Sequence, residues 1–246
     1  KTGFSVGTNF EYYDDLFFGL GNSNYYEKIS TDSTASARQQ AQKGNYWDSF
    51  LNLNFTQDKR NRKFQTTKGY LSKYNLDIPI ISDTNSFINT FNYKYFSELY
   101  NDNVSTFGIS LGSAFSLDDS DIKLSERLFI PSSRLRGFEG GKVGPKDGND
   151  YVGGNYLATM NFASSIPQIL PNSQDTDFSV FLDVANIWGV DYDSNLNDSG
   201  KIRSSIGIGL DWFTVVGPIS FSYALPLSKD TNDVTQEFSF NLGTTF

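Results

Sequence analysis

The sequence predicts an all-β fold, an antiparallel transmembrane β-barrel with about eleven strands. Most of the chain consists of segments of about ten residues in which apolar and polar side chains alternate, and a bilayer-spanning strand needs about 9–11 tilted residues. Aromatic residues make up 16% of the chain, and short turns alternate with long loops. These three observations favour an outer-membrane barrel over a soluble β-sandwich, whose strands would be shorter and whose apolar faces would form a core.

The first segment, Thr2–Tyr12, shows the pattern most clearly, with Phe4, Val6 and Phe10 on one face and small or polar residues on the other. The same alternation recurs along the chain. The predicted strands are Thr2–Tyr12, Leu16–Ile29, Tyr46–Gln57, Gly69–Ile81, Ser86–Tyr100, Val104–Leu117, Asn155–Ile166, Asp177–Trp188, Ile202–Phe213, Ile219–Leu225 and Gln236–Phe246. The polar segment between Ile29 and Tyr46 is expected to be a loop with one helical turn.

The lengths of the connections predict the orientation. Short turns in outer-membrane barrels face the periplasm and longer loops face outward, so the pattern places the C-terminal Phe246 on the periplasmic side. Trp47 and Trp188 then lie near the long-loop side, and Trp212 lies near the short-turn side. This arrangement is typical of two interfacial aromatic girdles in contact with outer-membrane lipid.

Composition excludes several function classes. The formal net charge of −8 argues against nucleic acid as a partner. The chain has neither cysteine nor histidine, which excludes thiolate or imidazole metal ligands and a Ser-His-Asp triad. The glycine-rich run Gly137–Gly148 lacks the following helix that a phosphate loop needs, and the aspartate-rich loops lack calcium-site spacing. We therefore expect no cofactor, no metal and no enzymatic activity. An outer-membrane hydrolase with a Ser-Lys or carboxylate site on strands outside this chain stays open as an alternative.

The basic turn that contains Lys59, Arg60, Arg62 and Lys63 has two interpretations. It is either an ordinary charged turn or a contact for anionic headgroups or an accessory protein.

The number of predicted strands indicates that this barrel is incomplete. Eleven is odd, whereas single-chain bacterial barrels have even numbers of strands, and an open sheet edge cannot face lipid. We therefore expect further strands outside this chain.

Several stretches occur in an order that points to one family: Arg134–Phe138, Gly144-Pro145, Val152–Tyr156, Phe181–Gly189, Gly209–Tyr223 and Phe238–Phe246. The first three resemble the lumen-folded loop of the BamA-type outer-membrane assembly factors, and the others resemble the later strands of their barrel. That family has sixteen strands preceded by periplasmic POTRA repeats. The resemblance implies that residues 1–246 are the C-terminal part of one barrel domain, without the first five strands and the POTRA repeats.

The resemblance also implies a site. Arg136, Gly137 and Phe138 would form the tip of a loop that folds into the barrel, where Arg136 meets acidic or polar groups of the wall. Residue parity independently places Asp183 and Asn161 inward on adjacent strands. Gly137 would allow a close approach or a positive φ, and Phe138 would pack beside the ion pair. The family often has Glu where this chain has Asn161, which leaves Asp183 as the main counter-charge.

The last strand is the second implied site. Phe238, Phe240, Leu242 and Phe246 are expected to face lipid, while Gly243 faces inward with its polar neighbours. In the family this strand closes weakly against the first, which forms a lateral gate for β-barrel insertion. The implied partners are nascent outer-membrane β-barrel proteins, with accessory lipoproteins and periplasmic chaperones acting through POTRA repeats. The alternatives are a two-partner polypeptide secretion translocator, a passive porin, or a plain static strand in a closed barrel.

Overall fold

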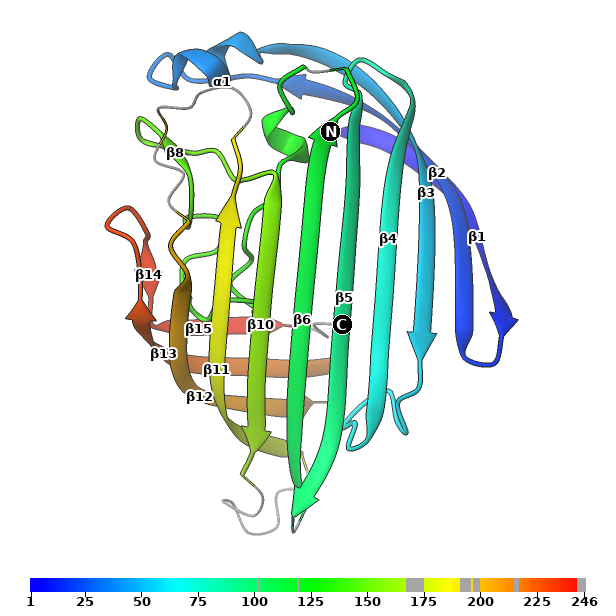
Figure 1. Cartoon of the computed structure of the whole chain (residues 1–246), viewed down its shortest axis with the longest axis vertical. Coiled ribbons are helices and arrows are strands. Elements are labelled where there is room, and N and C mark those ends of the chain that lie inside the picture. Colours follow the sequence, from blue (N-terminus) through cyan, green and yellow to red (C-terminus); the bar gives the residue numbers. More distant parts are fainter. Residues whose placement is uncertain are drawn as a thin grey trace.

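Eleven strands form one continuous antiparallel sheet in the computed structural model of this chain, in the order β1-β2-β3-β4-β5-β6-β10-β11-β12-β13-β15 (Figure 1). The structure describes residues 1–100, 102–118, 120–166, 175–190, 196, 200–214 and 217–242. Neighbouring wall strands are neighbours in the chain throughout, which is the meander expected of an up-and-down barrel. The predicted all-β antiparallel fold is confirmed.

The wall strands are β1 (Thr2–Tyr13), β2 (Leu16–Ile29), β3 (Gly44–Asp58), β4 (Gly69–Ser82), β5 (Ser86–Tyr100), β6 (Asn103–Ser116), β10 (Tyr156–Ser165), β11 (Thr176–Trp188), β12 (Arg203–Thr214), β13 (Gly217–Ser228) and β15 (Phe238–Leu242). The short elements between them are α1 (Ala37–Ala41), η1 (Leu124–Glu126), β7 (Gly137–Phe138), β8 (Lys146–Asp147), β9 (Asp150–Tyr151) and β14 (Thr235–Gln236). The alternation pattern placed β2 and β5 at these bounds, and most other strands differ from it by one to three residues.

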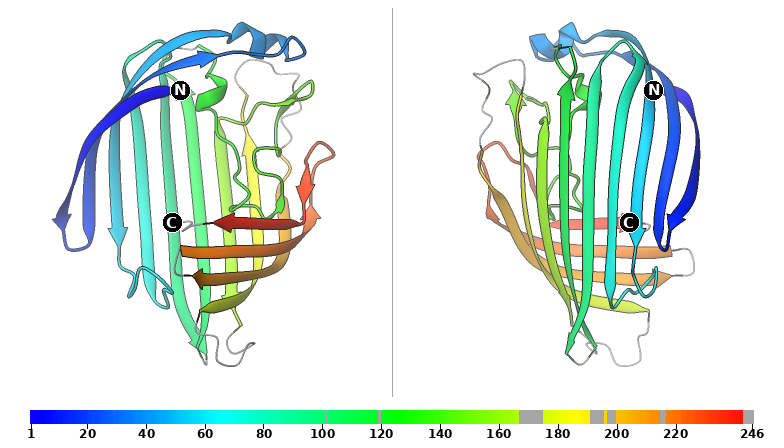
Figure 2. Two further views of the ribbon diagram at one scale, coloured as in Figure 1. Left: turned by 180° about the vertical axis from the view of Figure 1, so that it is seen from behind. Right: turned by 45° about the vertical axis from the view of Figure 1, so that its right-hand side comes forward.

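The sheet curves into an incomplete cylinder, and within the described residues β1 and β15 are its two edges (Figures 1 and 2). The segment between β6 and β10 returns into the concave side, and α1 lies over the long-loop end. Neither helix in the described residues has the length and the apolar character to cross a membrane. The concave side is therefore the interior in which any lumenal site must lie.

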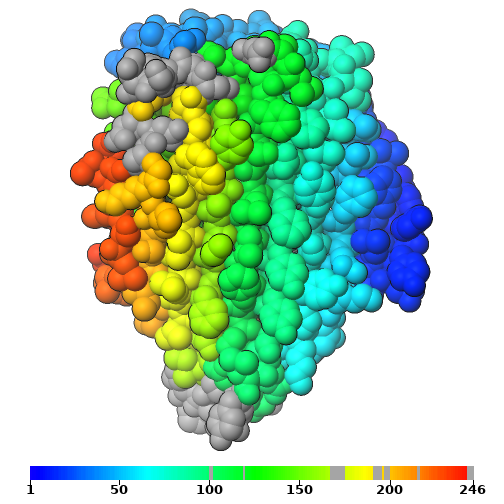
Figure 3. All heavy atoms as spheres, in the orientation of Figure 1, coloured from blue at the N-terminus to red at the C-terminus, as the bar shows by residue number. Residues whose placement is uncertain are grey.

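The two faces of the wall differ in chemistry. Outward side chains are mostly large, apolar and exposed, as at Met160 (53%) and Ile208 (57%). Figure 3 shows the outer surface of the wall, on which the strands lie side by side. Inward positions carry small polar side chains that are buried, such as Thr159 at 1% and Ser205 at 0% exposure. An apolar exterior around a polar interior is the pattern of a barrel in lipid.

A row of aromatic rings crosses the outer face near the short turns. Phe10, Phe18, Phe55 and Tyr74 occupy paired positions on β1 to β4, with ring centroids 5.4, 5.0 and 6.4 Å apart. Such rows favour the headgroup level, where a ring has both apolar and polar neighbours. This row was not singled out in the sequence because only strand register brings its members together.

The beginning of the last strand was predicted wrongly. Gln236 was expected to start it, but Thr235–Gln236 forms β14, which pairs with β7 in a separate small sheet. The wall strand starts at Phe238, because the backbone of the preceding residues is already hydrogen-bonded to the segment inside the barrel. Gly243 and Phe246 lie outside the described residues.

Strand β13 is longer than predicted, and it continues through Pro226 to Ser228. Proline lacks the N–H that a sheet ladder needs. The register shifts between Ser204 and Ser205 of the partner strand, opposite Pro226 and Ser228. This β-bulge accommodates the proline and lets pairing continue beyond it.

A charge near the middle of the outer face should separate the two faces experimentally. We expect Ile208→Arg to destabilise the folded barrel by about 2–4 kcal/mol, because it places a cation against lipid. Thr106→Arg, which points into the interior, is the matched control and should cost about 1 kcal/mol or less. Denaturant unfolding in lipid vesicles measures both, and equal losses would contradict the assignment of faces.

Candidate functional site

The segment between β6 and β10, residues 117–155, is here called the lumen loop. It contains η1, β7, β8 and β9, and it lies against the concave side of the wall (Figure 2). Side chains from β3, β11 and the β13–β15 connection hold it at separate points along its length. The candidate site is the set of contacts that fixes this loop.

Arg136 makes the contact nearest the tip. Its Nε and Nη2 donate to the two carboxylate oxygens of Asp183, each at 2.7 Å, and its backbone N–H donates to Oδ2 at 3.1 Å. The Asp183 side chain is 0% exposed and that of Arg136 is 20% exposed. A bidentate, charge-assisted pair of this kind sets the orientation of the loop as well as its position.

Asn161 donates a further hydrogen bond to Asp183. It lies directly opposite Asp183 in the β10–β11 register, and its Nδ2 donates to Asp183 Oδ1 at 2.8 Å. The same nitrogen donates to the backbone carbonyl of Arg134 at 2.8 Å. The structure thus brings the loop arginine and both predicted wall residues together in one hydrogen-bonded group.

Arg136 stacks on the ring of Phe181, a contact that was not among the expectations for the pair. The guanidinium carbon of Arg136 lies 3.3 Å from the centroid of the Phe181 ring, a stacked cation–π arrangement. Gly207 makes room for that ring, since a Cβ there would lie 2.5 Å from it. Phe181 lies two residues before Asp183, so alternation places both side chains on the inward face and parity alone could have identified Phe181.

Gly137 and Phe138 serve the packing of the tip. Gly137 has φ +90°, and a Cβ on it would lie 3.1 Å from Ala224, so both conformation and space favour glycine. Phe138 is buried in an apolar cluster. The other members are Ile130, Leu135, Val143, Ala185 and Ile187. Sequence reasoning treated this interval as polar, because its apolar residues follow neither a helical nor a strand period.

The tip is also joined to the start of the last strand. In the β7–β14 pairing Gly137 faces Gln236 and Phe138 faces Thr235. The N–H of Glu139 donates to the carbonyl of Val234 at 2.9 Å. Because β15 begins two residues after β14, the position of the tip and that of the last strand are mechanically linked.

A second buried ion pair holds the same region from the wall. Arg203 Nε donates to Asp233 Oδ2 at 3.0 Å and Nη2 to Oδ1 at 3.2 Å, with side-chain exposures of 1% and 0%. Asp233 Oδ1 also accepts the backbone N–H of Gly144 at 3.3 Å. No pattern in the sequence predicted this ion pair, because Asp233 lies in an irregular loop.

The first part of the lumen loop is held by Lys123. Its Nζ contacts Asp48 at 2.5 Å, Glu126 at 3.0 Å and Glu27 at 3.2 Å, and all four side chains are buried. Burial would lower the pKa of Lys123, but the hydrogen bond to Asp48 and the charge of Glu126 outweigh it and raise that pKa. The ammonium therefore stays charged, and it ties the loop to β2 and β3.

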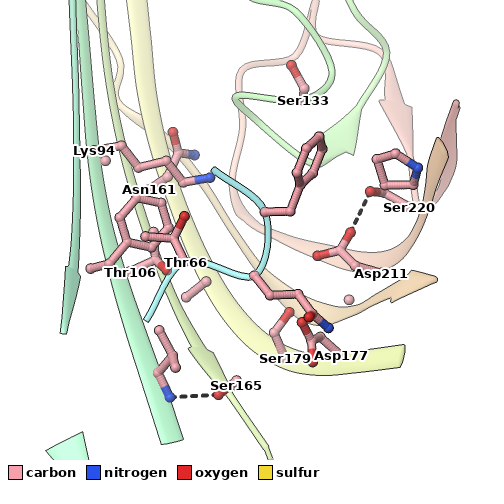
Figure 4. Close-up of a pocket in the computed structure, with 18 of the residues that line it drawn as sticks. Thr66, Lys94, Thr106, Ser133, Asn161, Ser165, Asp177, Ser179, Asp211 and Ser220 are labelled. Atoms are coloured by element: carbon pink, nitrogen blue, oxygen red, sulfur yellow. Dashed lines mark hydrogen bonds between the residues drawn. The ribbon is translucent and has the colours of Figure 1, made fainter. Parts of the chain in front are cut away.

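The basic turn lies between β3 and β4, where residues 61–65 are exposed and some of the side chains also line the interior. Arg60 forms a fork with Asp58, at 2.8 Å from each carboxylate oxygen, whereas Arg62 and Lys63 line an interior cavity of about 1360 Å³ (Figure 4). Arg134 and Arg136 line the same cavity at the tip of the lumen loop. The cavity therefore spans the interior between the loop tip and the short turns.

The predicted membrane-facing residues lie as follows. Phe238, Phe240 and Leu242 of β15 are exposed on the outer face at 58%, 49% and 70%, while Ser239 between them is buried. Trp47 at the start of β3 and Trp188 at the end of β11 share the long-loop side, and Trp212 lies at the opposite end. Trp188 stacks on Tyr156 at 5.9 Å.

The chain was then compared with known proteins. The model of the Omp85 superfamily domain matches residues 1–246. The outer membrane protein assembly factor BamA of Neisseria meningitidis serogroup B is 28% identical over 216 residues, which cover 73% of this chain and 26% of that protein. This chain thus spans about a quarter of that relative's length.

Two solved structures show the same fold. BamA from Haemophilus ducreyi lacking POTRA domains 1–3 has a TM-score of 0.85 at 22% identity, covering 96% of this chain and 52% of that one. CdiB from Acinetobacter baumannii has a TM-score of 0.59 at 12% identity, covering 97% and 41% respectively. In both cases the likeness extends over nearly all of this chain and about half or less of the other.

Removing Arg136 should loosen the barrel. Arg136→Ala leaves the Asp183 carboxylate buried without its cation, and loss of one partner of a buried pair costs about 3–5 kcal/mol. We expect the folded band of the purified intact protein to unfold at a lower temperature on a semi-native gel. Arg38→Ala, which removes an exposed pair with Asp121, is the control and should cost about 0.5 kcal/mol or less. Identical unfolding temperatures for Arg136→Ala and wild type would rule out this role.

Proposed function

Because this chain belongs to the Omp85 superfamily, we propose that it is the C-terminal part of an outer-membrane barrel that folds and inserts other β-barrel proteins. The similarity to BamA supports this, since that relative is named an outer membrane protein assembly factor. We propose that residues 1–246 belong to a barrel of sixteen strands. The earlier strands would lie between β1 and β15, and POTRA repeats would precede them.

One observation carries the proposed mechanism: the last wall strand is short and its start is held by the lumen loop. Within the described residues β15 pairs with β13 over five positions, from Tyr223–Phe238 to Ile219–Leu242, and its other edge is open. An open edge presents unpaired backbone groups that can pair with an incoming strand by β-augmentation. In the intact barrel the seam between this strand and the first would be the lateral gate.

The proposed role of Arg136, Gly137 and Phe138 is to keep that edge in place while its partner changes. Asp183 and Asn161 fix the loop to β10 and β11, and β7 fixes β14 just before β15. A client strand would therefore meet a positioned template instead of a frayed end. The step exchanges backbone hydrogen bonds and makes or breaks no covalent bond, so it requires neither a catalytic residue nor a cofactor.

The proposed setting is the bacterial outer membrane with the C-terminus in the periplasm. Leu242 pairs with Ile219, next to the short connection that precedes Gly217, so β15 runs toward the short-turn end. Short turns are periplasmic in such barrels. The proposed partners are nascent outer-membrane β-barrel proteins, with accessory lipoproteins and periplasmic chaperones acting through the POTRA region.

A passive porin is disfavoured because the lumen loop and the turn at Arg62 occupy the interior. A polypeptide translocator would pass its partner through that interior and would not need the seam to open. The seam is therefore the feature that separates this alternative from the proposed insertase.

Locking the seam tests the proposal. In the intact protein, Phe240→Cys combined with a cysteine on the facing first strand should form a disulfide that prevents strand exchange. We expect insertion of a barrel client into vesicles, measured by its folded band and protease protection, to fall to that of empty vesicles. Reduction should restore it, and each single cysteine variant serves as a control. Equal insertion by the oxidised and reduced double variant would contradict the gate.

A further inference from the structure

The last strand leaves its neighbour β13 before β13 ends. β13 continues to Ser228, whereas its pairing with β15 stops at Tyr223 and Phe238. Within the described residues, neither the last strand nor the connection before it pairs with residues 225–228. The segment that could pair there, residues 233–236, is bonded to the lumen loop instead.

One carboxylate holds that segment on the lumen loop. Asp233 accepts two hydrogen bonds from Arg203 of β12, at 3.0 and 3.2 Å. It also accepts the backbone N–H of Asp230 at 2.6 Å and that of Gly144 in the lumen loop at 3.3 Å. The Asp233 side chain is completely buried, so its charge depends on these donors. Asp233 therefore fixes the wall, the lumen loop and the connection relative to one another.

Arg203 is itself fixed to the wall. It is the first residue of β12, and its side chain is 1% exposed. Its Nη1 donates to Asn186 Oδ1 of β11 at 2.8 Å and to the carbonyl of Lys201 at 2.8 Å. Because these two acceptors hold the guanidinium, the connection comes to Arg203 rather than the reverse.

A second arrangement is open to the same residues. The register of β13 and β15 continues through a hydrogen bond from the Ala224 N–H to the Glu237 carbonyl at 2.8 Å. One step further, it would place Gln236 opposite Leu225 as a non-hydrogen-bonded pair. Residues 229–232 would then close a four-residue hairpin loop, which is a common length. The last strand would become longer at its beginning.

The ion pair opposes this second arrangement. In it β13 would lie between Asp233 and β12, so the backbones of Asp233 and Arg203 would be two strand spacings apart, roughly 10 Å. The guanidinium is held on the opposite side by Asn186, so both charges would remain buried without a partner. Pro226 adds to this preference, because it has no N–H to donate to a further strand. Residues 233–236 therefore stay away from β13.

We propose that Arg203 and Asp233 are positioning residues for the last strand: they hold residues 233–236 on the lumen loop, so that this strand begins at Phe238 and stays short. Their part in strand exchange rests on the proposed function, since a short last strand gives the first strand fewer positions to pair with and separates from it faster. Every group involved belongs to β11, β12, the lumen loop or the β13–β15 connection. The arrangement therefore does not depend on strands outside this chain.

Cross-linking reports which arrangement the segment takes. Leu225→Cys/Gln236→Cys is introduced into the intact protein in lipid vesicles, because opposite residues of such a pair have Cα atoms about 4.5 Å apart, which suits a disulfide. We expect little cross-linking by mass spectrometry of the oxidised protein. Adding Arg203→Met/Asp233→Asn should increase it at least about fivefold. That replacement removes both charges, so none stays buried alone, and a folded band on a semi-native gel establishes that the variant folds.

Two controls bracket this measurement. Tyr223→Cys/Phe238→Cys joins residues that already face each other, so it should cross-link equally with and without the ion pair. Glu139→Gln/Lys142→Gln removes an ion pair of the lumen loop that does not reach the wall. It should leave the cross-linking of positions 225 and 236 as in wild type.

Client insertion reports the consequence for the gate. We expect Arg203→Met/Asp233→Asn to slow insertion of a barrel client at least about threefold at equal amounts of folded protein, because more pairs must separate. The cross-link needs no client, so it can be read even if the seam does not open and the proposed function fails. Equal cross-linking with and without Arg203 and Asp233, or the same increase in the control variant, would overturn the positioning role. Unchanged insertion despite increased cross-linking would overturn its part in strand exchange.

Discussion

The carboxylate of Asp183 is the constraint on which the interior of this protein depends. It is completely buried on the inner wall, where an unpaired charge would be strongly unfavourable. Arg136 supplies two side-chain hydrogen bonds and one backbone hydrogen bond, and Asn161 supplies a fourth. A loop of nearly forty residues is thereby brought to one point of the wall, and its tip takes the conformation that only glycine at position 137 adopts without strain.

Once the tip is fixed, the rest of the interior follows from it. The β7–β14 pairing attaches the start of the last strand to the tip, and Arg203 with Asp233 holds the connection just before it. Lys123 secures the other end of the loop to β2 and β3. The wall is thus tied together across its interior, and the space below the tip is the interior cavity. Stability and the position of the edge strand therefore share one support.

Much of the wall could be predicted from the sequence, because alternation has a period of two and each strand buries one face. The strands Leu16–Ile29 and Ser86–Tyr100 were predicted at their observed bounds, and parity alone placed Asp183 and Asn161 inward. The approach of Arg136 to the wall followed from the family resemblance, since no local pattern shows where a long loop folds.

The contacts that the sequence did not predict join residues that follow no periodic pattern of apolar and polar side chains. The Lys123 cluster joins residues up to about a hundred positions apart, and the Arg203–Asp233 pair joins a strand to an irregular loop. The apolar residues that form the core of the lumen loop are scattered among polar residues in the sequence, so the composition of this segment did not indicate a core. Gln236 was assigned to the wall because the alternating sequence around it suits a strand. Its backbone pairs instead with Gly137 at the tip of the lumen loop. In each case tertiary contact decided what local preference could not.

A double-mutant cycle on Arg136 and Asp183 tests the central claim most directly. The free energies of unfolding of wild type, Arg136→Gln, Asp183→Asn and the double variant would be measured in the intact protein in micelles. If the pair anchors the loop inside the barrel, the coupling energy should be at least about 1.5 kcal/mol, and the double variant should be more stable than the sum of the single losses predicts. Additive losses, within about 0.5 kcal/mol, would show that the two residues act independently and would contradict the account.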